Sequence, residues 1–291
     1  MTSTKNNLNG WLVIDKPPQM SSTQVVGKIK HLLHPNKIGH AGTLDPLATG
    51  VLPIALGKAT RLIPFVMNDK KVYEFDIQWG TQTTSDDLDG IIVAQNNQAP
   101  TQEALLKVLP LFRGQILQTP SIFSALKVNG KRAYELARQG QEVALSPRPV
   151  FIYDLQVVAH TPQKSNFIAT VSKGTYIRTL AHDIAAKLGM LGVVVRLHRT
   201  LDGPFTITQA TNWTTENLDQ QILPMEAVLT SLPHREVSPE TAGRLQHGQR
   251  IKDDSFQTLP QNTPIVFVCQ GRLVALGQIT NAVLHPTWVN A

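Results

Sequence analysis

One short segment places a single carboxylate among apolar residues. Residues 38–57, IGHAGTLDPLATGVLPIALG, contain one formally charged side chain, Asp45, and one histidine, His40. A carboxylate removed from water needs a cation or several N–H donors as partners, and without them its pKa rises. An aspartate before proline is also a common turn residue that caps local amides. The spacing alone favours the turn, and catalysis is the alternative.

Other motifs of reactive sites are absent or wrongly spaced. Six residues separate Gly50 from Gly57, whereas a phosphate loop needs four between its glycines. His31 and His34 are not part of an H-E-x-x-H zinc motif, and neither G-x-G-x-x-G nor G-x-S-x-G occurs. The single cysteine, Cys269, excludes an internal disulfide and a cysteine-rich zinc site. It fits a reducing cytoplasm.

Charge and composition point to a globular protein with an anionic partner. The 291 residues are 42% hydrophobic and 16% charged, which predicts an ordinary buried core. The net charge is +6, and a basic excess of this kind suits nucleic acid as well as a solvated surface. No long apolar run predicts a membrane span or a signal peptide, so we expect a cytoplasmic protein. The basic residues form small groups: Lys28 and Lys30; Lys70 and Lys71; Lys127, Lys131 and Arg132; Arg196 and Arg199.

The hydrophobic pattern predicts an irregular alternation of strands and helices. Apolar runs, alternating or continuous, predict strands at 11–17, 71–80, 91–95, 151–160 and 166–174. Helical spacing, with caps at Ser21 or Ser22 and at Thr101, predicts helices at 21–34, 101–112, 131–140 and 175–189. The order fits an α+β fold with a mixed sheet better than regular βαβ winding.

A domain boundary is predicted near residues 230–236, within LTSLPHREV. Beyond it, SPETAGRLQHG predicts a helix capped by Ser238, with Pro239 in its first turn. TPIVFVCQGRLVALGQITN predicts a hairpin that turns at Gln270–Gly271. We therefore expect a domain at 1–230 and a small β-rich domain at 231–291.

Five ordered blocks resemble the TruB family of tRNA pseudouridine-55 synthases. They lie within residues 11–205 and read WLVIDKPPQMSS, GHAGTLDPLATGVLPIALGKAT, SALKVNGKRAYELARQG, SKGTYIRTLAHDIA and RLHRTLDGPF. The C-terminal part is similar, more weakly, to the RNA-binding PUA module. The resemblance implies a pseudouridine synthase fold, with a mixed, largely antiparallel sheet flanked by helices and followed by a PUA-like domain.

The resemblance also implies a reaction and a set of partners. Uridine 55 in the TΨC stem-loop of tRNA would be flipped out and isomerised to pseudouridine. An isomerisation needs no cofactor and no metal. The chain would be a monomeric, cytoplasmic enzyme without an obligate protein partner and without a membrane partner.

The family pattern assigns roles to six residues. Asp45 matches the catalytic aspartate, Arg178 the arginine that pairs with it, and Tyr73 the aromatic that stacks on uracil. The phenol of Tyr73 could also accept the C5 proton. The remaining matches bind the substrate: His40 fills the space of the flipped base, and Tyr176 and Leu197 line the base pocket. Lys16 matches a supporting residue without a chemical step.

Basic residues of the third block extend the prediction to the RNA path. We expect the RNA backbone to be contacted by Lys127, Lys131 and Arg132. We expect no residue of the chain to bind a metal ion. Four positions depart from the common family pattern without touching the aspartate or its arginine: Gln19, Thr84, Phe123 and His198. An RNA chaperone without catalysis, and a synthase that works within a guide-RNA particle, are the alternative functions.

Overall fold

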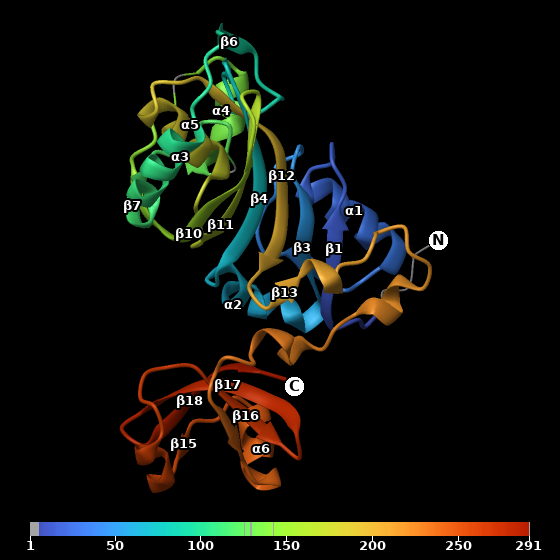
Figure 1. Cartoon of the computed structure of the whole chain (residues 1–291). Coiled ribbons are helices and arrows are strands. Elements are labelled where there is room, and N and C mark those ends of the chain that lie inside the picture. The colour runs from blue at the N-terminus through green and yellow to red at the C-terminus, as the bar shows by residue number, and fades with distance from the viewer. Residues whose placement is uncertain (1–5, 125, 129, 142, 291) are drawn as a thin grey trace.

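A twisted sheet forms the frame of the N-terminal part of the molecule (Figure 1). The computed structural model describes residues 6–124, 126–128, 130–141 and 143–290. The main path of this nine-stranded sheet runs β1-β3-β12-β4-β11-β10-β7, with β2 beside β3 and β13 beside β12. Its strands are β1 Gly10–Lys16, β2 Ile38–His40, β3 Thr49–Leu56, β4 Lys71–Trp79, β7 Gly114–Gln118, β10 Arg148–His160, β11 Lys164–Val171, β12 Gly192–Asp202 and β13 Phe205–Thr206. Its pairings are antiparallel except that between β12 and β3, which confirms the predicted mixed, largely antiparallel sheet.

Helices and two small hairpins complete this part. The α-helices are α1 Ser22–Leu33, α2 Ile63–Met67, α3 Gln102–Val108, α4 Ala133–Arg138 and α5 Ile177–Lys187. The hairpins pair β5 Thr81–Thr83 with β6 Ile92–Gln95, and β8 Lys127–Val128 with β9 Lys131–Arg132. Short 3-10 helices lie at η1 Gly57–Leu62, η2 Leu109–Phe112, η3 Ile207–Gln209, η4 Leu218–Gln221 and η5 Met225–Val228. None of the described helices is long and apolar enough to span a membrane.

Local sequence signals explain where the first helix begins. The Ser21 hydroxyl accepts a hydrogen bond from the backbone N–H of Gln24, and the Gln24 side chain accepts one from the backbone N–H of Ser21. This reciprocal capping box satisfies two of the amide donors that a helix N-terminus leaves free. Behind the cap, Val25 and Ile29 are fully buried. The predicted cap at Ser21 is therefore confirmed; of the apolar residues at helical spacing, Ile29 and Leu33 are buried, whereas Leu32 is 51% exposed.

The core lies between the sheet and the helices that cover one of its faces. Phe75 of β4 and Phe167 of β11 are register partners, and their rings stack with centroids 5.2 Å apart. Leu180 and Ile184 of α5 are fully buried in the same hydrophobic cluster. Because side chains alternate along a strand, Tyr73 lies on the same face of β4 as Phe75 and is directed toward α5.

A second, smaller sheet follows in the C-terminal part (Figure 1). Its strand order is β14-β16-β17-β18-β15, and the predicted hairpin at Gln270–Gly271 joins β16 to β17. One hydrophobic cluster contains Trp11 and Phe205 of the large sheet together with Leu276 and Trp288 of the small one. The division at 230/231 remains a prediction. The elements are β14 His234–Glu236, α6 Pro239–Gln246, β15 Ile251–Lys252, η6 Asp254–Thr258, β16 Ile265–Cys269, β17 Arg272–Thr280 and β18 Val283–Val289.

Candidate active site

Asp45 lies in the loop between β2 and β3 and faces a buried arginine. Its Oδ2 is 2.9 Å from Nε of Arg178, which lies in the first turn of α5. The Asp45 side chain is 32% exposed, whereas that of Arg178 is 4% exposed. The Nε–H is not aligned for a hydrogen bond with the carboxylate, so the contact is an ion pair held by charge. The structure thus brings together the two residues that the family pattern pairs.

The guanidinium of Arg178 is fixed by the surrounding backbone and by a second aspartate. It donates hydrogen bonds to the carbonyl oxygens of Ser85, at 2.9 Å, and of Phe123, at 3.0 Å. Its Nη1 also lies 3.4 Å from Oδ2 of Asp87, whose side chain is 4% exposed. Burial raises the pKa of Asp87, while the Ser85 hydroxyl and the Arg178 cation act in the opposite direction. Arg178 therefore has a single orientation, with its Nε toward Asp45.

Tyr73 reaches the site from the middle of the sheet. It is 6% exposed, and its register partner on β12 is Arg199, whose Nη1 lies 3.5 Å from the phenol oxygen. Burial raises the pKa of Tyr73, and the Arg199 cation opposes this shift. Leu197, also on β12 and 6% exposed, lies opposite Phe75 on the same face. The sheet register explains why these two predicted pocket residues share one face.

Tyr176 and His40 lie at the ends of elements that lead into the site. Tyr176 is the N-cap residue of α5, where Gln118 of β7 bonds both its N–H and its carbonyl group. Burial raises the pKa of the Tyr176 phenol. His40 ends β2, and its pKa is lowered first by burial and further by the charges of Arg199 and Arg132. His40 is therefore neutral at neutral pH.

Lys16 holds the backbone of the Asp45 loop through hydrogen bonds. Its side chain is buried at the end of β1, and its ammonium group donates to the carbonyl oxygens of Pro17, Met20 and Pro46 at 2.7, 2.6 and 3.2 Å. Burial lowers the pKa of Lys16 to about 8, and the neighbouring Asp45 charge opposes that shift. Since Pro46 follows Asp45 directly, this ammonium fixes the backbone beside the carboxylate.

Replacing Lys16 with Met is expected to destabilise the fold. The change leaves the half-buried carbonyl groups of Pro17 and Met20 without this donor, whereas the Pro46 carbonyl keeps the N–H of Gln19 at 2.8 Å; each lost partner costs about 1–3 kcal/mol. We expect the free energy of unfolding in denaturant titrations to fall by about 3 kcal/mol or more. Lys107→Met, at an exposed lysine of α3, provides the control and should lower it by less than about 1 kcal/mol. Equal losses in the two variants would show that the Lys16 contacts do not stabilise the loop.

The predicted RNA-contacting residues form an exposed hairpin. Lys127 of β8 is the register partner of Arg132 of β9, and both are exposed, as is Lys131. The Arg132 charge affects the pKa of His40, so this hairpin lies within electrostatic reach of the site. Among the residues that the structure describes, no group of three or more His, Cys, Asp or Glu side chains could hold a metal ion.

Four residues near the site were not found from the sequence. Asp87 belongs to TSDDLDG, which has the composition of a solvent-exposed turn, yet it is 3% exposed. The other three, Lys71, Arg199 and Asp202, form a buried charged cluster beside Tyr73. A signal for two of them is the charged pattern RTLD, residues 199–202, which follows His198 in the fifth block.

Comparisons with a family model and with solved structures show which class of protein this is. A family model described as TruB family pseudouridylate synthase (N terminal domain) matches residues 30–177. A solved H/ACA RNP bound to a substrate RNA containing 2'-deoxyuridine has a chain of the same fold, with a TM-score of 0.73 at 23% identity over 97% of this chain and 85% of that one. A Cbf5-Nop10-Gar1 complex gives a TM-score of 0.73 at 24% identity, over 96% and 84% of the two chains. The protein is a pseudouridine synthase with the predicted α+β fold.

Whole-chain relatives narrow the class further. The tRNA pseudouridine synthase B of Bartonella tribocorum is 40% identical over 304 residues, covering 96% of this chain and 95% of its own length. That of Nitrobacter winogradskyi is 41% identical over 295 residues, covering 97% and 82%. The chain belongs to the TruB family.

Proposed function

We propose that this chain converts uridine 55 in the TΨC arm of tRNA to pseudouridine, with Asp45 as the catalytic carboxylate. The relatives named tRNA pseudouridine synthase B support the substrate, since they are similar over nearly the whole chain. The observation that carries the assignment of Asp45 is its geometry. A partly exposed carboxylate lies 2.9 Å from an almost completely buried guanidinium that three other groups hold in place.

The chemistry explains why a carboxylate is needed. The N1–C1′ bond of the uridine breaks, the freed uracil turns, and C5 forms the new bond to C1′. The C5 proton then leaves and N1 carries a proton, so the product is an isomer of the substrate. Positive charge develops at C1′ as the first bond breaks, and a fixed carboxylate stabilises that charge, as in glycoside hydrolysis. Asp45 either attacks C1′ directly or assists loss of the C2′ proton to form a glycal.

The other residues hold the flipped base. The target lies inside a folded loop, so the enzyme must extract it and replace the lost stacking. In this assignment Tyr73 stacks on the uracil and can accept the C5 proton, while Tyr176 and Leu197 line the pocket. His40, which is neutral at neutral pH, occupies the space left in the RNA.

A tritium-release assay tests the function directly. Purified protein is incubated with a tRNA transcript that carries tritium at C5 of its uridines, without guide RNA or other proteins. We expect tritium release and, on sequencing, pseudouridine at position 55 alone. Binding without release would favour an RNA chaperone, and release that requires a guide RNA would favour a particle-bound synthase.

Charge reversal tests the proposed RNA path. Because each phosphate contact contributes about 0.9 to the slope of log Kd against log salt, changing Lys127, Lys131 and Arg132 together to Glu should lower that slope by about 2–3. We expect tRNA binding in filter assays to weaken by at least about tenfold at low salt. Lys187→Glu, an exposed site at the far end of α5 from Arg178, is the control and should change binding by less than about twofold. Unchanged binding in the triple variant would remove this hairpin from the RNA path.

A further inference from the structure

A charged cluster that the proposed reaction does not use lies beside Tyr73. It consists of Lys71, Arg199 and Asp202, whose side chains are 9%, 1% and 0% exposed. Nζ of Lys71 is 3.1 Å from Oδ1 of Asp202, and Nη2 of Arg199 is 3.1 Å from Oδ2 of the same carboxylate. One buried anion therefore bridges two buried cations.

The pairing register of β4 and β12 brings this cluster together beside Tyr73. On β4 and β12, Tyr73 lies opposite Arg199, and Lys71 lies opposite Asp202. A register shift between Arg199 and Leu201 interrupts the ladder between these two pairs. The ammonium of Lys71 also donates to the carbonyl oxygen of Asp69, at 3.0 Å. The same two strands thus carry both the pocket residue and the charges behind it.

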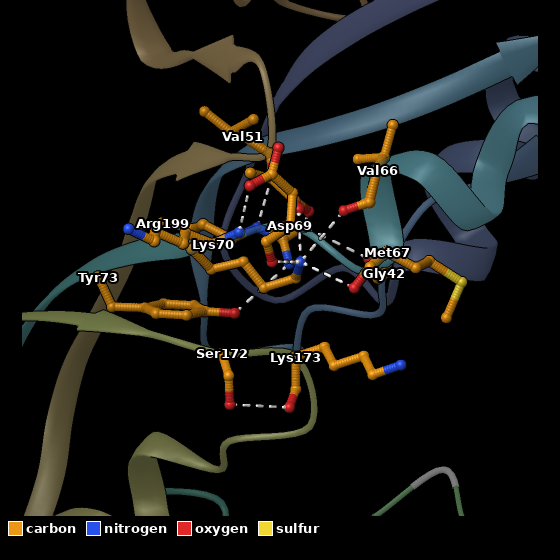
Figure 2. Close-up of polar contacts among 12 residues, drawn as sticks. Gly42, Val51, Val66, Met67, Asp69, Lys70, Tyr73, Ser172, Lys173 and Arg199 are labelled. Atoms are coloured by element: carbon orange, nitrogen blue, oxygen red, sulfur yellow. Dashed lines mark hydrogen bonds and ion pairs between the residues drawn. The ribbon is translucent and has the colours of Figure 1, made fainter. Parts of the chain in front are cut away.

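Arg199 connects the cluster to the Asp45 loop and to Tyr73. Its Nε donates to the Val51 carbonyl at 2.8 Å, its Nη2 to the Gly42 carbonyl at 3.3 Å, and its Nη1 lies 3.5 Å from the Tyr73 hydroxyl (Figure 2). Figure 2 shows the Tyr73 ring with its hydroxyl directed toward this guanidinium. Gly42, three residues before Asp45, has a φ of +121°, and a Cβ there would lie 3.3 Å from Oδ2 of Asp202. The Asp45 loop therefore packs directly on the Arg199–Asp202 pair.

Stability alone gives little reason for such a cluster. Removing charges from water is expensive, and well-packed apolar side chains of similar volume are often at least as stabilising as a buried ion pair. What an apolar replacement cannot do is fix a guanidinium that contacts the Tyr73 hydroxyl. Without Asp202, the Arg199 guanidinium would lose the carboxylate that holds its Nη2 and could turn away from Tyr73, and two cations would also be left close together in the interior.

We propose that Asp202 is a positioning residue for the reaction, which holds the Tyr73 hydroxyl in place through Arg199. This inference rests on the proposed function, because it assumes that Tyr73 contacts the flipped uracil. Asp202 itself touches neither the base nor the sugar. Lys71 completes the arrangement by offsetting the Asp202 charge and anchoring the start of β4.

Single-turnover kinetics with saturating enzyme test this role. Asp202→Asn is expected to slow pseudouridine formation by about tenfold, with tRNA affinity changed by less than about threefold. In a Tyr73→Phe background the same change should slow the reaction by less than about threefold, because the hydroxyl it positions is already gone. The double variant Lys71→Met with Asp202→Asn removes one charge of each sign, keeps the net charge and should show the same tenfold loss in a stably folded protein.

Asp76→Asn is the matched control. Asp76 is also a buried carboxylate of β4 with two cationic neighbours, Lys164 at 2.9 Å and Arg196 at 3.9 Å. Unlike Tyr73, however, it lies on the opposite face of the sheet. It should lower the melting temperature and leave the single-turnover rate unchanged. A wild-type chain without activity would overturn the proposed function and this inference with it. With an active wild type, an Asp202→Asn variant no slower than Asp76→Asn, or equal losses with and without the Tyr73 hydroxyl, would overturn the positioning role alone.

Discussion

Replacing Asp45 with Asn is expected to abolish pseudouridine formation while tRNA binding survives. The amide has the same shape but carries no charge, so it can neither stabilise positive charge at C1′ nor attack that carbon. We expect the tritium-release rate to fall by at least about 10⁴-fold, the order of loss seen when a central catalytic group is removed. The fold should be retained, because the Asp45 side chain is 32% exposed and its amide can remain beside Arg178.

A second paired aspartate provides the control for this variant. Asp154 is 40% exposed and lies 3.2 Å from Nη2 of Arg113, so it too is a partly exposed carboxylate paired with an arginine, although Arg113 is 47% exposed. Asp154→Asn should retain full activity, since Asp154 pairs with Thr170 on the face of the sheet opposite to that of Tyr73. Substantial turnover by Asp45→Asn, with a correctly folded protein and normal tRNA binding, would refute the assignment of the catalytic carboxylate.

Local patterns predicted those elements whose stability is visible in their own residues. The helix at 22–33 has a capping box and a buried stripe, and the strand at 71–79 alternates inward and outward residues. The strand β3 gives weaker signals, because Pro53 lacks an amide hydrogen and argues against a central strand. In the structure Pro53 pairs with Val13 of β1, and its carbonyl group accepts the N–H of Ala41. Only tertiary pairing makes this segment a strand.

The site was predictable in type but not in its partners. Physical reasoning showed that Asp45 needs a cation, but not which one, because Arg178 lies far along the chain, in the first turn of α5. The resemblance to the family supplied that arginine, and the ion pair is present in the structure. Asp87 shows the limit of composition, since an acidic, glycine-ended segment indicates a solvated turn until the fold buries it. For Asp202, only the register of β12 against β4 shows that its carboxylate meets Lys71.

Replacing Arg178 with Lys is expected to lower turnover by about 100-fold, although the charge is kept. The guanidinium reaches Asp45, Asp87 and two backbone carbonyl groups at once from a planar fork, and a single ammonium cannot. The variant should therefore bind tRNA within about threefold of the wild type but hold Asp45 in several orientations.

The pKa of Asp87 gives this prediction a second readout. Burial already raises it, and the Arg178 cation is one of the groups that oppose the shift. With a mobile ammonium in place of the guanidinium, the pKa of Asp87 should rise further, so its charge is lost as pH falls through that higher value. The turnover of Arg178→Lys should consequently decline with acid at a higher pH than that of the wild type. Arg196→Lys, at a 46% exposed arginine paired with Glu74 on the opposite face of the sheet, should leave both turnover and its pH profile unchanged. If Arg178→Lys also left turnover and its pH profile unchanged, the planar shape of the guanidinium would not matter, and Asp45 would need only a nearby positive charge to act.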